Sequence, residues 1–137
     1  MKLPAALLAL GLLAAGCASL DTHQAADYSK VRRIYVEHRL TDNHHLDELI
    51  AAELNARGYT ATCGPLTMMP EGMDAIITYE DRWAWDFHSY LMELRVELRA
   101  NITDQPLAAG HYHQAAATTK STEAVVREII DSLFKRR

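Results

Sequence analysis

Residues 90–102, YLMELRVELRANI, decide the fold class. Apolar and polar side chains alternate along this stretch, which places them on opposite faces of a β-strand. The apolar positions are Met92, Leu94, Val96, Leu98, Ala100 and Ile102, and the polar positions are Glu93, Arg95, Glu97, Arg99 and Asn101. One face of the sheet is therefore expected to cover a core and the other to meet water. Such one-sided sheets are typical of antiparallel strands.

Further strands are expected before and after this one. Runs rich in β-branched and aromatic residues predict strands at 31–38, 60–63 and 74–86. Turn chemistry at 103–106 predicts that residues 107–118 return as a paired strand.

Two amphipathic helices are predicted. The first spans 42–57, begins with Asp42 or Asn43 as a cap and ends at Gly58. The second begins after the cap Ser121, and its apolar stripe comprises Val125, Val126, Ile129, Ile130, Leu133 and Phe134. The sequence therefore predicts an α+β two-layer sandwich, with two helices on one face of a mostly antiparallel four- to five-stranded sheet.

The N-terminus has the features of an export signal. Lys2 precedes an apolar run at 3–13, which is much shorter than the ~20 residues that a membrane-spanning helix needs. The run ends in Leu13-Ala14-Ala15-Gly16-Cys17, which resembles a lipobox, with Ala14 where that motif usually has Leu. The resemblance implies that residues 1–16 are a lipoprotein signal peptide and that Cys17 is lipidated. The alternative is ordinary signal cleavage after Ala18.

The domain organisation follows from this signal. Residues 17–29 are expected to be the lipidated N-terminus and a polar tether, and residues 30–137 a single domain. Ala18, where inner-membrane lipoproteins tend to have Asp, resembles the outer-membrane sorting pattern. The expected location is the cell envelope, lipid-anchored, at the outer membrane and facing the periplasm.

The charge balance excludes one class of partner. The 137 residues carry a formal net charge of −4 at pH 7. A mildly acidic domain is poorly suited to nucleic acid, whose recognition depends on Lys and Arg at phosphates.

Catalytic and metal-binding motifs are weak. His111 and His113 share a strand face, but zinc needs three or four ligands and no carboxylate or Cys lies at a matching spacing. Cys63 has no evident activating partner, and neither a nucleophile elbow nor a Gly-rich phosphate loop is present. We therefore expect no enzyme, no metal and no cofactor. The alternative is a small periplasmic metal-binding protein or hydrolase that uses His111, His113 and nearby carboxylates.

An aromatic segment is the most specific internal feature. Trp83, Trp85 and Phe87 lie at one parity of the 74–86 strand and its end, and Tyr90 follows. These four residues form either part of the core or an exposed binding patch. We expect Trp83 and Trp85 to share a face and at least one of them to be substantially buried.

Four features together resemble small uncharacterised lipoproteins of Gram-negative bacteria. They are the lipobox, the helix ending in Arg57-Gly58-Tyr59, the segment Trp83-Ala84-Trp85-Asp86 and the Ser121-capped last helix. The resemblance carries over no catalytic or ligand-binding residue. With the anchor and the missing catalytic set, it indicates a membrane-anchored envelope lipoprotein, acting as a non-enzymatic binding or assembly-accessory module with an envelope protein partner.

Overall fold

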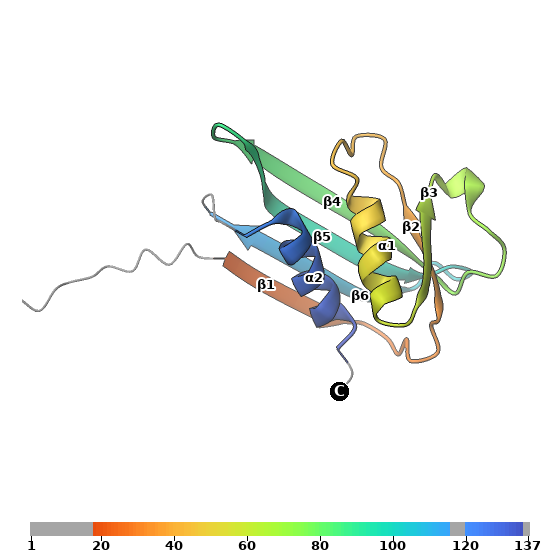
Figure 1. Ribbon diagram of the computed structural model, residues 1–137. Coiled ribbons are helices and arrows are strands. Elements are labelled where there is room, and N and C mark those ends of the chain that lie inside the picture. Colours follow the sequence, from red (N-terminus) through yellow and green to blue (C-terminus); the bar gives the residue numbers. More distant parts are fainter. Residues whose placement is uncertain (1–17, 116–119, 136–137) are drawn as a thin grey trace, which may run out of the picture.

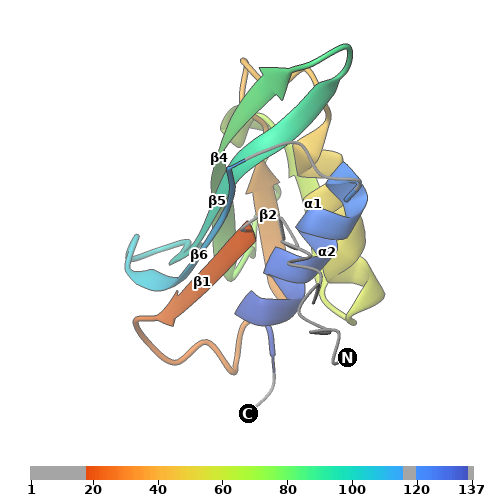
Figure 2. The same cartoon turned by 90° about the vertical axis from the view of Figure 1, so that its left-hand side faces the viewer.

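Six strands and two α-helices make up the parts of the chain that this computed structural model describes, residues 18–115 and 120–135. In chain order the elements are β1 (Ala18–Gln24), β2 (Arg33–Glu37), α1 (Leu46–Ala56), β3 (Thr60–Gly64), the 3-10 turn η1 (Leu66–Met68), β4 (Ala75–Trp85), β5 (Ser89–Ala100), β6 (Pro106–Gln114) and α2 (Thr122–Leu133). The strands form one sheet in the order β1-β6-β5-β4-β2-β3, and both helices cover the same face of it (Figures 1 and 2). The predicted α+β class and two helices are confirmed.

The sheet differs from the prediction in strand number and direction. Within residues 18–115 and 120–135 it has six strands, and it is mixed, because β2 pairs in parallel with both β3 and β4 while the remaining pairs are antiparallel. The parallel pair arises because α1 connects β2 to β3 and returns the chain to the end at which β2 began. Three of the five strand pairs are antiparallel as predicted, whereas the predicted number of four to five strands was wrong and the two parallel pairs were not foreseen.

The additional strand is β1, which lies within the segment predicted to be a tether. It forms one edge of the sheet, antiparallel to β6, and only Leu20 among its side chains is even half-buried. A polar edge strand is held by backbone hydrogen bonds and shows no apolar alternation, so its sequence gives no signal of a strand. Residues 18–24 are consequently part of the folded domain and not of a tether. The predicted signal peptide, 1–16, and Cys17 lie outside the described residues.

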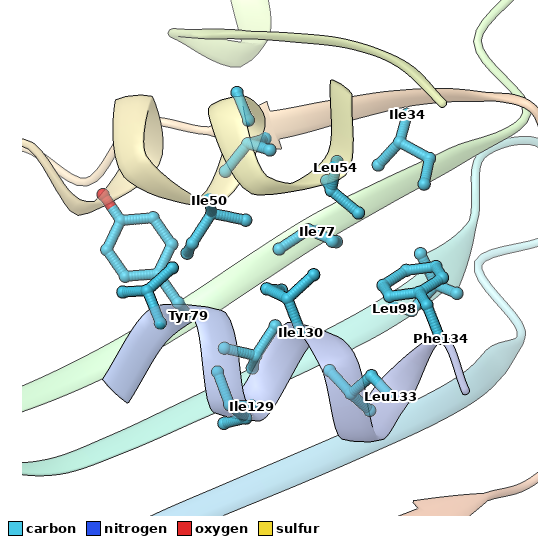
Figure 3. Packing of buried hydrophobic residues seen from close by; sticks show 14 of the residues in the cluster. Ile34, Ile50, Leu54, Ile77, Tyr79, Leu98, Ile129, Ile130, Leu133 and Phe134 are labelled. Atoms are coloured by element: carbon cyan, nitrogen blue, oxygen red, sulfur yellow. The ribbon is translucent and has the colours of Figure 1, made fainter. Parts of the chain in front are cut away.

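The core lies between the sheet and the two helices, as Figure 3 shows for ten labelled side chains. Ile50 and Leu54 of α1 and Ile129 of α2 are fully buried there. Helix α2 lies so close to β6 that a Cβ atom on Gly110 would be 3.0 Å from Ile129 Cγ1. The Ser121 cap is confirmed, because its hydroxyl oxygen accepts a hydrogen bond from the Ala124 N–H at 3.1 Å.

Strand β5 follows the predicted alternation in its middle and departs from it at both ends. Leu94, Val96 and Leu98 are buried as expected. At one end the register with β4 shifts by one residue, so that Met92 is the extra residue of a bulge and Leu91 takes the core position. At the other end Ile102 lies in the turn after the strand and is 94 % exposed. The prediction that Met92 and Ile102 lie on the core face of this strand was therefore wrong.

Candidate functional site

The aromatic segment runs up the end of β4 and around the hairpin to β5. Trp83 forms the base of this hairpin and is half-buried against the core. Its indole N–H donates a hydrogen bond to Asp81 Oδ2 at 2.7 Å, and its ring stacks on His44 with the centroids 3.6 Å apart. These contacts tie Trp83 to the loop that precedes α1.

Trp85 and Phe87 form the opposite end of the segment, which we call the aromatic tip. Trp85 is 74 % exposed and Phe87 is 94 % exposed. The hairpin turns through Asp86, Phe87 and His88, and Phe87 adopts the left-handed backbone conformation, with φ at 61°. A bulky residue is rarely found in this conformation, which favours Gly or Asn. Phe87 is thus strained and also contributes little to the core.

The aromatic residues therefore do not act as one unit. β4 is continuous through Trp83 and Trp85, so the two side chains share a face, but Trp85 lies beyond the edge of the core. Tyr90 is half-buried on β5, with its ring centroid 5.9 Å from that of His88. Of the four residues predicted as a patch, Trp85 and Phe87 are the two whose side chains are mostly exposed to solvent.

A buried polar cluster lies at the start of α1, next to Trp83. Asp42 is 6 % exposed, and its Oδ1 accepts a hydrogen bond from the His44 N–H while its Oδ2 accepts from the Leu46 N–H, both at 2.8 Å. The Tyr79 hydroxyl also donates to Oδ2, at 2.6 Å. Burial raises the pKa of Asp42, but these hydrogen bonds outweigh it and hold the pKa below its ordinary value. Helix α1 begins at Leu46 and not at the predicted residue 42, and its N-cap residue is His45, whose side chain makes no capping hydrogen bond. Asp42 instead binds the N–H of the first helical residue from the preceding loop, and Tyr79 is its unforeseen partner.

A second buried carboxylate belongs to Asp47, which is 4 % exposed. Its Oδ2 lies 3.0 Å from His38 Nδ1, and its Oδ1 is buried with no hydrogen-bond partner among the described residues. The Cys63 thiol lies near the same carboxylate. Burial, with the charge of Asp47 as a further cause, raises the pKa of Cys63 to about 11. This thiol therefore stays protonated at neutral pH and is a poor nucleophile.

Two groups of described side chains have the spacing of metal ligands: His38, Asp42 and Asp47, and Asp42, His44 and Asp81. In the second group, Asp81 already accepts hydrogen bonds from Trp83 and from the Arg39 guanidinium, at 2.9 Å. A cation there would lie next to a fixed positive charge. The first group is the better candidate for a cation site, although both oxygens of Asp42 already accept hydrogen bonds. Sequence reasoning missed both groups because their members come from different elements.

The predicted histidine pair lies on the open face of the sheet, away from these groups. His111 Nε2 is 2.6 Å from Glu93 Oε1, and the ring centroids of His111 and His113 are 6.4 Å apart. Glu93 also accepts hydrogen bonds from Arg82 at 3.1 Å and Arg95 at 3.3 Å. Hydrogen bonds from Arg82 and His111 lower the pKa of Glu93 to about 2. The arrangement is a surface ion cluster in which two guanidinium groups surround the nearest carboxylate.

In residues 18–115 and 120–135, no helix combines the length and the apolar character that crossing a bilayer requires.

The comparisons with known proteins show a fold and no family. No family model matches the chain, and no curated protein is significantly similar to it. The PelC dodecamer from Paraburkholderia phytofirmans is similar in structure, with a TM-score of 0.61 over 85 % of this chain and 94 % of that one, at 10 % identity. A PDZ domain protein from Parabacteroides distasonis matches with a TM-score of 0.53 and 9 % identity, over 86 % of this chain and 36 % of that one.

A minor lipoprotein from Acinetobacter baumannii aligns over 74 % of this chain and 84 % of its own at 16 % identity, with a TM-score of 0.33. A TM-score of this size does not establish a shared fold. The PelC and PDZ protein matches establish the α+β fold alone, since a shared fold does not imply a shared function.

Proposed function

We propose that the chain is an envelope lipoprotein, anchored through lipid on Cys17, whose domain is a non-enzymatic binding module. The observation that carries the binding role is the aromatic tip. Two large apolar side chains, Trp85 and Phe87, stand at the end of a hairpin and add little to the core. Phe87 does so in a strained backbone conformation. Strain and exposed apolar surface that folding does not require favour a role in binding.

The chemistry of the described side chains supports the non-enzymatic part of the proposal. The raised pKa of Cys63 disfavours a thiolate nucleophile. Glu93 is held as a carboxylate by two guanidinium groups and His111, which makes it a poor general base.

The anchor can be tested by mass spectrometry of the mature protein. We expect its first residue to be Cys17 carrying a diacylglyceryl group and an amide-linked acyl chain. An unmodified N-terminus after Ala18 would overturn the lipoprotein assignment.

The binding patch can be tested by a photo-reactive amino acid placed at residue 87 in cells, with residue 102 as the matched control. Phe87 and Ile102 are equally exposed, at 94 %, but lie beyond opposite ends of β5. We expect reproducible adducts from residue 87 and few from residue 102. Equal yields at the two positions would contradict the proposal.

The alternative, a metal-binding protein or hydrolase, makes a different prediction. Elemental analysis of the purified protein would find stoichiometric zinc or copper. If metal is found, replacing His111 and His38 separately distinguishes the surface histidines from the cluster at α1. Metal retained in both variants would exclude both sites.

A second copy of the chain is a candidate partner for the module. The PelC neighbours are dodecamers, and β1 and β3 form the two opposite edges of this sheet, where no other described segment pairs with them. Unpaired edges on opposite sides allow head-to-tail association into a ring. We therefore propose that the module assembles with itself through these edges. Light scattering of the detergent-solubilised protein at several concentrations tests this, and a monomeric mass throughout would overturn it.

A further inference from the structure

The aromatic tip and the first described residue lie at the same end of the sheet (Figure 1). The strand register shows this directly. Ser19 pairs with His113, His113 with Glu93, and Glu93 with Arg82, so these four residues form one row across β1, β6, β5 and β4. Only Ala18 precedes this row in β1. Strand β4, in contrast, continues past the row to Trp85 and into the hairpin turn.

The attachment point of the lipid follows from covalent geometry. Cys17 is joined to Ala18 by one peptide bond, so their Cα atoms are about 3.8 Å apart. A lipid on Cys17 therefore holds this end of the sheet close to the membrane without a flexible spacer. Trp85 lies three residues beyond the row, about 10 Å at roughly 3.3 Å per residue of strand. Phe87 lies at the turn that follows.

We propose that the aromatic tip, Trp85 and Phe87, inserts into the lipid surface of the membrane to which Cys17 is anchored. This inference rests on the proposed function and names the occupant of the binding patch. An indole ring is amphipathic and is enriched at the headgroup level of membranes, while a phenyl ring favours the adjacent acyl chains. The acyl chains on Cys17 and the tip then contact the membrane at two separated points, which fixes the orientation of the domain.

The charged groups around the tip are compatible with insertion of Trp85 at the headgroup level and of Phe87 among the adjacent acyl chains. Asp86 and His88 flank Phe87 and are exposed, so they can remain among the headgroups while the phenyl ring reaches deeper. The guanidinium of Arg82, three residues before Trp85 in β4, is paired with Glu93 at 3.1 Å. Ile102 lies in the turn beyond the opposite end of β5, and this orientation keeps it in water.

The two tryptophans of the chain make the proposal measurable. The mature lipoprotein is reconstituted in vesicles of phosphatidylethanolamine and phosphatidylglycerol, with and without brominated acyl chains. The variant Trp83→Phe leaves Trp85 as the only tryptophan, and the variant Trp85→Phe leaves Trp83. We expect brominated lipid to quench Trp85 and the bilayer to shield it from aqueous iodide. Trp83, which is stacked on His44, should show no quenching by bromine.

Each other outcome contradicts the proposal. A Trp85 that remains open to iodide and insensitive to bromine lies in water. A Trp85 that is shielded from iodide without bromine quenching is covered by protein, such as a second copy. Circular dichroism and thermal melting of both variants establish that the fold is retained.

Failure of the anchor can be told apart from failure of the tip. If mass spectrometry finds no lipid on Cys17, the lipoprotein assignment fails, and the same quenching is measured after the protein as isolated is added to vesicles. In the Cys17→Ala chain, the double change Trp85→Ser and Phe87→Ser should weaken vesicle partitioning by about tenfold or more, because two apolar side chains are lost from the interface. Ile102→Ser should leave partitioning unchanged, and an equal loss in both would overturn the proposal.

Discussion

The hydroxyl group of Tyr79 links the sheet to the start of α1. It donates to Asp42 Oδ2 at 2.6 Å, and the same carboxylate accepts the N–H groups of His44, in the loop before α1, and of Leu46, the first residue of α1. This single contact therefore joins strand, loop and helix. Its energy depends on Asp42 being ionised, so it responds to pH.

Stability is expected to fall in acid through Asp42. Its folded-state pKa lies below the ordinary value of 3.8, so the carboxylate contributes stability above pH 3.8 that is lost as the pH falls through the lowered pKa. Tyr79→Phe removes one of the hydrogen bonds that lower this pKa. We expect the Asp42 carboxyl to titrate at a higher pH, and stability at neutral pH to fall by about 1.5–3 kcal/mol. Carbon-13 NMR titration measures the pKa of Asp42, and urea unfolding measures the stability.

The matched control for Tyr79→Phe is Tyr90→Phe, since Tyr90 is half-buried on β5. That change should leave the titration of Asp42 where it is. If the pKa of Asp42 is the same in the Tyr79→Phe variant and in the parent, the Tyr79 hydroxyl does not lower that pKa.

The two tryptophans are expected to contribute unequally to stability. Trp83→Ala removes a half-buried ring, its stacking on His44 and its hydrogen bond to Asp81, and should cost about 1–3 kcal/mol, below the ~3–5 kcal/mol for a fully buried ring. Trp85→Ala should change stability by no more than about 0.5 kcal/mol, because the side chain is mostly exposed. Chemical unfolding compares them, and equal costs would mean that the tip packs on the domain.

At the scale of elements, α2 depends on one apolar stripe for its position. Ile129 is fully buried against the sheet and lies next to Gly110, the residue that allows the close approach of β6. A larger residue at 110 would push against the same side chain. The packing of α2 thus depends on complementary sizes in two elements.

Truncation of Ile129 tests this packing. Ile129→Ala is expected to lower the free energy of unfolding by about 2–5 kcal/mol, the range for a buried aliphatic side chain. Arg127→Ala on the exposed face of the same helix should cost about 0.5 kcal/mol or less, even though it removes a 3.4 Å pair with Glu53. A loss below about 1 kcal/mol for Ile129→Ala would indicate that α2 is not held by the core.

At the scale of the whole molecule, Ala18, which follows the proposed lipid anchor, lies at the same end of the sheet as the aromatic tip. We expect Cys17→Ala to abolish retention in the membrane fraction at high salt, because the acyl chains supply most of the membrane affinity. Fractionation of cell envelopes followed by immunoblotting measures this. A mutant that stays with the membranes would show that the aromatic tip or a partner is sufficient for retention.

The sequence by itself determined the α+β class, the two helices and most of the strand positions. Those features are encoded locally, as in the alternation of residues 93–98 and the Ser121 cap, where a side chain's neighbours in sequence are also its neighbours in the element. The aromatic residues of the tip were also visible from sequence. Their division into a tied base, Trp83, and an exposed end, Trp85 and Phe87, was not, because it depends on where the core stops.

Only the tertiary structure decided the rest. Strand β1 pairs through its backbone and carries no apolar pattern, and the parallel direction of β3 depends on how α1 packs. The cluster of His38, Asp42, Asp47 and Tyr79 joins residues that are up to about forty positions apart in the chain. Contacts of this kind arise when the elements pack, so no window of sequence contains them. The same reason applies to the placement of the aromatic tip beside the start of β1, which gives the hairpin its proposed role at the membrane.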